Sequence, residues 1–322
     1  MKSAIVTGIR GQDGSYLAEQ LITEGYKVYG LIRRASHGLD LGCATPLEGN
    51  PLLEVVEGDL LDATGLAHLC SRVRPDLFFN MAAQSHVGSS FIQPTYTAQV
   101  SGIGVLNCLE AIRLSGAHTR FLQASTSELY GGVTSEAQGE EDNFHPRSPY
   151  GCAKLFGYWI TVNYRESYKM FACNSICFNH ESERRGPNFV TRKITVAAAR
   201  ISKGLQDQVY LGNLDARRDW GYAPDFCRGM IMMLTKSPQP KDYVLATGES
   251  HSVRDFCRAA FSHVGLNWND HVKIDPQFYR PAEVEVLLGD YSSINKDLGW
   301  EPWTKFNELV IRMVDNDLML LE

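Results

Sequence analysis

A glycine-rich turn close to the N-terminus constrains the fold of this chain more than any other feature. The apolar run over residues 2–7 predicts a buried parallel strand, and residues 12–25 carry apolar side chains at helical spacing. Between them, Gly8, Gly11 and Gly14 recur at every third position. A strand, a glycine turn and a helix in this order bring backbone N–H groups and a helix N-terminus against a pyrophosphate. The sequence therefore predicts a dinucleotide-binding βαβ unit.

The alternation of strand and helix patterns continues through the first half of the chain. Such a series predicts a right-handed, doubly wound parallel sheet of the α/β class. The expected strands are 27–32, 53–57, 76–82, 120–124, 172–178 and 242–246, and the expected helices are 63–74, 96–114, one beginning at Tyr150, and 224–234. Residues 35–51 are glycine-rich and lack a period, so a loop is expected there.

The character of the chain changes after residue 178. Short strand or loop segments and scattered cationic groups follow, as is typical of a smaller α/β lobe that closes over a substrate. We predict a dinucleotide-binding Rossmann domain over residues 1–178 and about 222–250. The remaining residues, about 179–221 and 251–322, are expected to form the substrate-binding domain.

Composition argues against several functional classes. The 322 residues are 44% hydrophobic and 21% charged, which is typical of a globular enzyme and not of a disordered chain. A net charge of −6 argues against a nucleic-acid or membrane partner. The apolar start over residues 1–8 is too short for a signal peptide or a membrane span, so a cytoplasmic protein is expected. The eight cysteines show no zinc spacing, and no metal site is predicted.

Two arginines follow the second predicted strand. An NAD-binding enzyme places an acidic residue here for the adenosine ribose, whereas Arg33 and Arg34 favour a 2′-phosphate. We therefore predict NADP as the cofactor; the alternative is a solvated basic turn. Asp59-Leu60 and residues 81–85 follow two further strands. Small residues there would let the cofactor backbone approach closely, although tight packing between strand and loop explains them equally well.

Side chains with acid–base chemistry gather between residues 125 and 154. Thr126, Ser127 and Glu128 follow a predicted strand, and Tyr150 and Lys154 lie four residues apart on a predicted helix. The Lys154 charge is expected to lower the pKa of Tyr150, so that the phenolate can accept a proton from a sugar hydroxyl. Partial burial is expected to raise the pKa of Glu128. The alternatives are a surface pair on the helix and a carboxylate that caps the next turn.

These motifs resemble the extended short-chain dehydrogenase/reductase superfamily and, within it, the GDP-mannose 4,6-dehydratase family. The matching strings run from the first strand almost to the C-terminus and include TGIRGQDGSYLAEQL, ASTSELYG, PRSPYGCAKL, FNHES, VTRKI, RDWG and RPAEVE. Glu128 is a single carboxylate where related epimerases carry none and dTDP-glucose dehydratases carry an Asp-Glu pair. The resemblance implies NADP-dependent dehydration of GDP-mannose to GDP-4-keto-6-deoxy-mannose, with a hydride moved from C4 to C6 and no net redox change.

The resemblance also implies a site, residue by residue. The implied catalytic residues are Thr126, Glu128, Tyr150 and Lys154. The implied cofactor contacts are Thr7, Gly8, Gly11, Gln12, Asp13, Gly14, Arg33, Arg34, Asp59, Leu60, Met81, Ala82, Ala83, Gln84, Ser85, Tyr96, Tyr150, Lys154, His180 and Arg185. The implied contacts to a GDP-sugar are Ser85, Thr126, Ser127, Glu128, Asn179, Val190, Lys193, Leu211, Gly212, Asn213, Arg218, Arg280 and Glu283.

Two stretches depart from the family pattern. Arg10 replaces a small or β-branched residue in the phosphate turn, and residues 37–50 do not resemble the family's loop after the double arginine. In the family that loop reaches a neighbouring subunit, so a homo-oligomer, either a dimer or a tetramer, is implied. Three alternatives stay open: dehydration of GDP-manno-heptose, a related nucleotide-sugar reductase or epimerase, and a non-catalytic NADP-binding regulatory protein.

Overall fold

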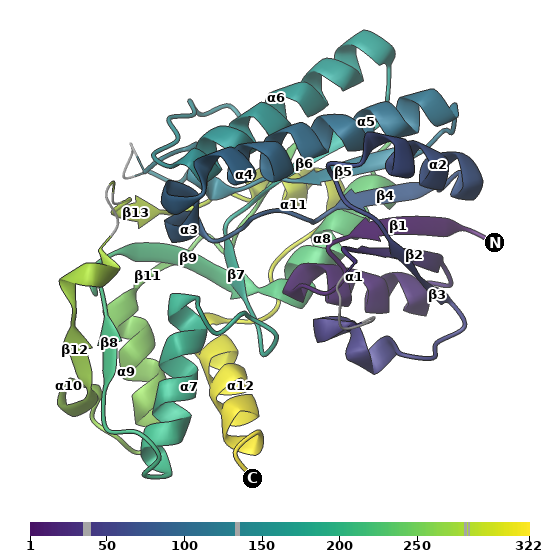
Figure 1. Cartoon of the computed structure of the whole chain (residues 1–322). Helices are drawn as coiled ribbons and strands as arrows, with labels where there is room; N and C mark the ends of the chain where they lie inside the picture. Colours follow the sequence, from purple (N-terminus) through teal and green to yellow (C-terminus); the bar gives the residue numbers. More distant parts are fainter. Residues whose placement is uncertain (35–39, 133–135, 280–281, 283) are drawn as a thin grey trace.

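A seven-stranded parallel sheet organises the fold (Figure 1), in the strand order β10-β6-β5-β4-β1-β2-β3. The computed structural model describes residues 1–34, 40–132, 136–279, 282 and 284–322. The strands are β1 (Ser3–Thr7), β2 (Lys27–Ile32), β3 (Leu53–Glu57), β4 (Leu77–Asn80), β5 (Arg120–Ala124), β6 (Ala172–Cys177) and β10 (Tyr243–Leu245). All neighbouring pairs are parallel. The predicted doubly wound α/β sheet is confirmed.

Helices cover both faces of this sheet, α2, α5 and α6 on one and α1 and α8 on the other (Figure 1). Their bounds are α1 (Gln12–Thr23), α2 (Ala63–Val73), α5 (Gly104–Ser115), α6 (Pro149–Tyr168) and α8 (Ala223–Thr235). Along β1, Ile5 packs in the core beneath α2 and α5, whereas Ala4 and Val6 pack beneath α1 and α8. Because both faces are covered, the strand is apolar without alternation.

A smaller group of strands and helices forms a second hydrophobic core (Figure 1). One sheet holds β7 (Asn179–Glu181), β9 (Arg217–Tyr222), β11 (Ser250–Ser252) and β13 (Val286–Leu287), and β8 (Val209–Leu211) pairs with β12 (Val272–Ile274). The helices are α7 (Val190–Ser202), α9 (Val253–His263), α10 (Trp268–His271) and α12 (Phe306–Met319). The predicted domain boundaries stay a prediction. Residues of α11 (Ser292–Leu298) and Trp300 pack instead in the core of the seven-stranded sheet.

Two segments differ from the predicted secondary structure. Within the predicted 35–51 loop, Gly42–Leu47 forms a 3-10 helix, η1, because Ala44 and Leu47 are buried against the core beside α1. Residues 35–39 of that loop lie outside the described residues. The predicted helix 96–114 consists of three consecutive pieces, α4 (Pro94–Ala98), the π-helical turn η2 (Gln99–Ile103) and α5. A proline at the first position favours the earlier start.

The remaining short elements complete the description. They are α3 (Val87–Ile92) and the 3-10 helices η3 (Ser127–Leu129) and η4 (Pro276–Phe278). Among the described helices, none combines the length and the apolar composition that crossing a bilayer requires.

Candidate active site

The turn between β1 and α1 is packed so closely that its glycines are required. Gly8 has a φ of +68°, and a Cβ there would lie 2.9 Å from the Ala82 backbone nitrogen. A Cβ on Gly14 would lie 2.4 Å from the Gly8 carbonyl oxygen. Any side chain at either position would therefore collide with backbone. The turn therefore packs directly against the backbone of the segment that follows β4.

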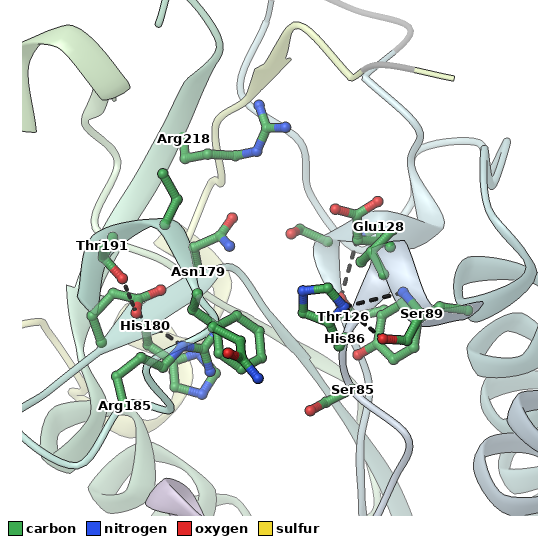
Figure 2. A pocket seen from close by; sticks show the side chains of 18 of the residues that line it. Ser85, His86, Ser89, Thr126, Glu128, Asn179, His180, Arg185, Thr191 and Arg218 are labelled. Carbon is green, nitrogen blue, oxygen red and sulfur yellow. Dashed lines mark hydrogen bonds and ion pairs between the residues drawn. The ribbon is translucent and has the colours of Figure 1, made fainter. Parts of the chain in front are cut away.

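A cavity of about 890 Å³ lies beside the carboxyl ends of the sheet strands and is closed by residues of the second core (Figure 2). Figure 2 shows Thr126, Glu128 and His86 on one wall, facing Asn179 and Arg218 on the other. The predicted site residues that line it are Asp13, Met81, Ala83, Ser85, Thr126, Ser127, Glu128, Tyr150, Lys154, Asn179, His180, Arg185, Val190, Lys193, Leu211, Gly212, Asn213 and Arg218.

A second pocket, of about 470 Å³, contains the predicted residues Arg33, Arg34 and Asp59. It is also lined by Arg10, which the sequence marked as a departure from the family. The predicted site residues that line neither cavity are Thr7, Gly8, Gly11, Gln12, Gly14, Leu60, Ala82, Gln84 and Tyr96. Arg280 and Glu283 lie outside the described residues.

Glu128 and Tyr150 line the same cavity because η3 packs against the start of α6. Glu128 is buried in η3, where its backbone N–H donates to Thr126 Oγ1 at 3.3 Å. Tyr150 is in the first turn of α6, whose N-cap Ser148 accepts a hydrogen bond from Gly151 N at 3.0 Å. A Cβ on Gly151 would lie 3.0 Å from the Glu128 carbonyl oxygen, so the glycine lets α6 begin directly against η3.

The predicted lowering of the Tyr150 pKa is wrong for this structure. Burial raises the pKa of Tyr150 above its ordinary range and the Glu128 charge adds to the increase, while a hydrogen bond from Thr126 and the Arg185 charge lower it. The Lys154 ammonium donates to the Ala124 carbonyl oxygen at 2.7 Å, and it lies 5.8 Å from the centre of the Tyr150 ring. Helical spacing places the two residues on one face of α6. The Lys154 ammonium nevertheless binds the Ala124 carbonyl oxygen at the end of β5.

Lys154 itself is almost fully buried, and burial lowers its pKa to about 8. The folded pKa is thus below the unfolded value of about 10.4, and between these pH values the unfolded chain binds the extra proton. The free energy of unfolding contributed by Lys154 should therefore rise with pH, by at most about 1.4 kcal/mol per unit. We expect the stability of the parent relative to Lys154→Met to increase between pH 8 and pH 10 in urea unfolding.

The exposed Lys236 offers the control for this prediction. The Lys236→Met variant should follow the parent in parallel over the same pH range. Parallel curves for Lys154→Met as well would show that Lys154 keeps its ordinary pKa in the folded chain.

An ion pair links the phosphate turn to the second cavity wall. His180 Nε2 lies 2.9 Å from Asp13 Oδ2, and the His180 Nδ1–H donates to the Phe178 carbonyl oxygen at 2.7 Å. Burial opposes ionisation of both groups, but their mutual attraction and hydrogen bond lower the pKa of Asp13 to about 2 and raise the pKa of His180. Gln12 Nε2 also donates to the His180 carbonyl oxygen, at 3.1 Å. The turn is therefore held in place by β7.

Arg185 and Lys193 provide positive charge on the same side of the cavity. Arg185 Nε lies 2.9 Å from Glu181 Oε2, and its guanidinium stacks 3.6 Å from the centre of the Phe189 ring. Lys193 Nζ lies 3.6 Å from the centre of the Phe278 ring. An aromatic ring therefore contacts each cation in the cavity wall, and Arg185 is held by the Glu181 carboxylate as well.

Sequence reasoning missed several aromatic residues that line the cavity, among them His86, Phe189, Phe278 and Tyr279. His86 Nδ1 accepts a hydrogen bond from Ser89 N at 3.1 Å, which caps α3. It directly follows Ser85 in the segment after β4, so extending the predicted stretch 81–85 by one residue would have included it. The other three lie at the ends of short elements, Phe189 at the N-cap of α7 and Phe278 and Tyr279 at the end of η4, and no local pattern marks them.

Comparison with known proteins shows which family the chain belongs to. Residues 5–313 match the family model described as GDP-mannose 4,6 dehydratase. GDP-mannose 4,6 dehydratase 1 of Arabidopsis thaliana is 50% identical, over 99% of this chain and 90% of that protein. The human GDP-mannose 4,6 dehydratase is 46% identical, over 99% and 92%.

A solved structure extends the comparison to the fold. The UDP-glucose 4-epimerase of Thermus thermophilus, in complex with NAD, superposes with a TM-score of 0.82 at 26% identity, over 98% of both chains. The family predicted from the sequence is confirmed by the matches over the full chain. The chain belongs to the GDP-mannose 4,6-dehydratase family of nucleotide-sugar hydro-lyases.

Proposed function

We propose that the chain dehydrates GDP-mannose to GDP-4-keto-6-deoxy-mannose, with NADP as a cofactor that is regenerated in each turnover. The observation that carries the proposal is the shared wall of Glu128 and Tyr150, which are close enough for the Glu128 charge to raise the pKa of Tyr150. A carboxylate and a phenol beside one sugar provide the two proton-transfer groups that a 4,6-dehydration requires. An epimerase or a simple reductase has no use for the carboxylate.

A nicotinamide dinucleotide fits the residues present. The crowded Gly8–Gly14 turn leads directly into the N-terminus of α1, and a glycine turn followed by a helix N-terminus is the arrangement that binds a pyrophosphate. The pocket with Arg33 and Arg34 is where a 2′-phosphate would be bound, which favours NADP. Buried Ser125 Oγ and Asn179 Oδ1 have no hydrogen-bond partner among the described residues, as expected beside a ligand. When bound, the nicotinamide supplies the acceptor for the C4 hydride and returns that hydride at C6.

The chain's own residues supply the proton transfers. Tyr150 removes the proton of the 4-hydroxyl, and Thr126 donates a hydrogen bond to the oxygen that becomes the carbonyl. The new ketone acidifies the C5–H bond, so Glu128 takes that proton and passes it to the departing 6-hydroxyl. Tyr150 then returns its proton to C5. Because burial favours the neutral phenol, the positive charges of the cofactor ring and of Lys154 would be needed to form the phenolate.

The second cavity wall has groups suited to a nucleoside diphosphate. Arg218 and Lys193 provide positive charge, and Asn179 provides an amide. Arg218 is positioned by two backbone carbonyls, since its Nη1 donates to the Arg217 oxygen at 2.8 Å and to the Glu285 oxygen at 3.4 Å. We assign the GDP moiety to this wall.

We further propose a homo-oligomer, a dimer or a tetramer, located in the cytoplasm. Support for assembly comes from α6, whose outer side carries the half-exposed Phe156 and Trp159, with Ile103 of η2 nearby in the same layer. Large apolar side chains gathered on one helix are typical of subunit contacts.

The test is incubation with GDP-mannose and no added reductant, followed by mass spectrometry of the nucleotide sugar. We expect a product lighter by one water, formed with no net consumption of NADPH. GDP-manno-heptose assayed in parallel should react more slowly if the hexose is the substrate. An unchanged mass with both sugars would contradict the proposal, and net consumption of NADPH would instead indicate a reductase.

A further inference from the structure

The pocket that holds Arg33 and Arg34 has a third guanidinium group. Arg10 lies on the phosphate turn, between Gly8 and Gly11, and lines this pocket together with the ends of β2 and β3. A side chain in that turn starts beside the dinucleotide backbone and extends toward the adenosine half of the site. Arg10 is also the residue of this turn at which the sequence departs from the expected family pattern.

Arg10 is paired with a residue that sequence reasoning did not single out. Its guanidinium forms an ion pair with Asp40, whose other carboxylate oxygen accepts a hydrogen bond from Gly42 N at 2.7 Å. The Arg10 carbonyl oxygen accepts a hydrogen bond from Cys43 N at 3.1 Å. Side chain and backbone of Arg10 thus both contact the segment that leads into η1. The ion pair is well exposed, with 40% of the Arg10 side chain and 66% of the Asp40 side chain accessible.

The charges in the pocket show why one more cation matters. Three arginines and three carboxylates, Glu57, Asp59 and Asp62, line it, so their formal charges cancel. Without Arg10 the formal charge of the pocket would be −1, which opposes a phosphate.

The other two arginines of the pocket already have partners within the protein. Arg33 Nη1 donates to Tyr96 Oη at 2.7 Å, and Arg34 Nε lies 3.6 Å from Glu57 Oε2. An exposed arginine–carboxylate pair such as Arg10–Asp40 contributes little stability, so its arginine can change partners at low cost.

We propose that Arg10 is a third contact to the cofactor's 2′-phosphate and that Asp40 is the counter-ion it leaves when the phosphate binds. A phosphate with a charge near −2 and three acceptor oxygens is a stronger partner than an exposed carboxylate. The inference rests on the proposed use of NADP. Arg10 would then contribute to specificity for the 2′-phosphate in addition to Arg33 and Arg34. Asp40 would compete with the phosphate for Arg10 and so weaken phosphate binding.

The experiment measures binding of adenosine 2′,5′-bisphosphate and of 5′-AMP by calorimetry, so no turnover is needed. The parent is expected to prefer the bisphosphate. Arg10→Gln should reduce this preference about five- to tenfold and leave 5′-AMP binding within about twofold. Asp40→Asn should strengthen bisphosphate binding about two- to fivefold in the parent and leave it unchanged in the Arg10→Gln background.

A matched control is Arg258→Gln, which removes an exposed arginine paired with Asp255 at 3.0 Å on α9 and changes the net charge equally. It should leave the preference unchanged. If Arg10→Gln keeps the parent's preference within twofold, with the melting temperature unchanged, the inference is overturned while NADP stands. If the parent itself fails to distinguish the two nucleotides, the NADP proposal fails and the inference fails with it.

Discussion

Glu128→Gln should lower kcat by about 10²- to 10⁴-fold, the usual contribution of a general acid–base group. The amide keeps the shape of the buried side chain, but it cannot accept the C5 proton or pass a proton to the departing 6-hydroxyl. Oxidation at C4 is assigned in our proposal to Tyr150 and Thr126, so it should survive. Rapid mixing with GDP-mannose should therefore show reduced nicotinamide accumulating in absorbance, with no product lighter by one water.

Two comparisons make this result specific. The exposed Glu24→Gln variant should turn over at the parent's rate, because it removes a carboxylate outside both cavities. A Glu128→Gln enzyme within about tenfold of the parent would rule out the assigned role, since it would retain more activity than the loss of a general acid–base group allows.

Tyr150→Phe should reduce turnover by a similar factor, about 10²- to 10⁴-fold, but at an earlier step. Phenylalanine keeps the buried ring in the first turn of α6 and removes the hydroxyl that we propose as the acceptor of the 4-hydroxyl proton. Reduced nicotinamide should then fail to accumulate at all. The contrast between the two variants, accumulation with Glu128→Gln and none with Tyr150→Phe, separates the oxidation step from the elimination step.

Tyr168 provides the matched control, because it lies at the other end of α6 and is half exposed. Tyr168→Phe should leave both turnover and the absorbance transient unchanged. If Tyr150→Phe still reduces the cofactor at the parent's rate, a different group accepts the hydroxyl proton and the assigned role of Tyr150 is wrong.

Much of the fold could be predicted because the relevant signals are local. The apolar run of β1 and the spacing of Gly8, Gly11 and Gly14 are visible within fifteen residues, and the structure shows why no side chain fits at Gly8 and Gly14. Strand ends in a parallel sheet meet at one edge, so the predicted strands already placed Thr126 and Asn179 at a common cavity.

The parts that sequence reasoning missed depend on contacts between distant segments. Nothing near Arg10 predicts Asp40 as its partner, and nothing near Lys154 shows that it binds the Ala124 carbonyl oxygen rather than acting on Tyr150. The 3-10 helix at Gly42–Leu47 forms because two of its side chains are buried beside α1, a contact that the local composition does not reveal.

Residue order alone was enough to predict the doubly wound sheet, the family and the residues at the strand ends, because strand periodicity and glycine spacing act through the local backbone. The electrostatics of the cavity followed only from the folded arrangement, for example that the pKa of Tyr150 rises and that of Lys154 falls to about 8. Desolvation and charge–charge interactions depend on everything that packs around a group, and most of those neighbours are distant in the chain.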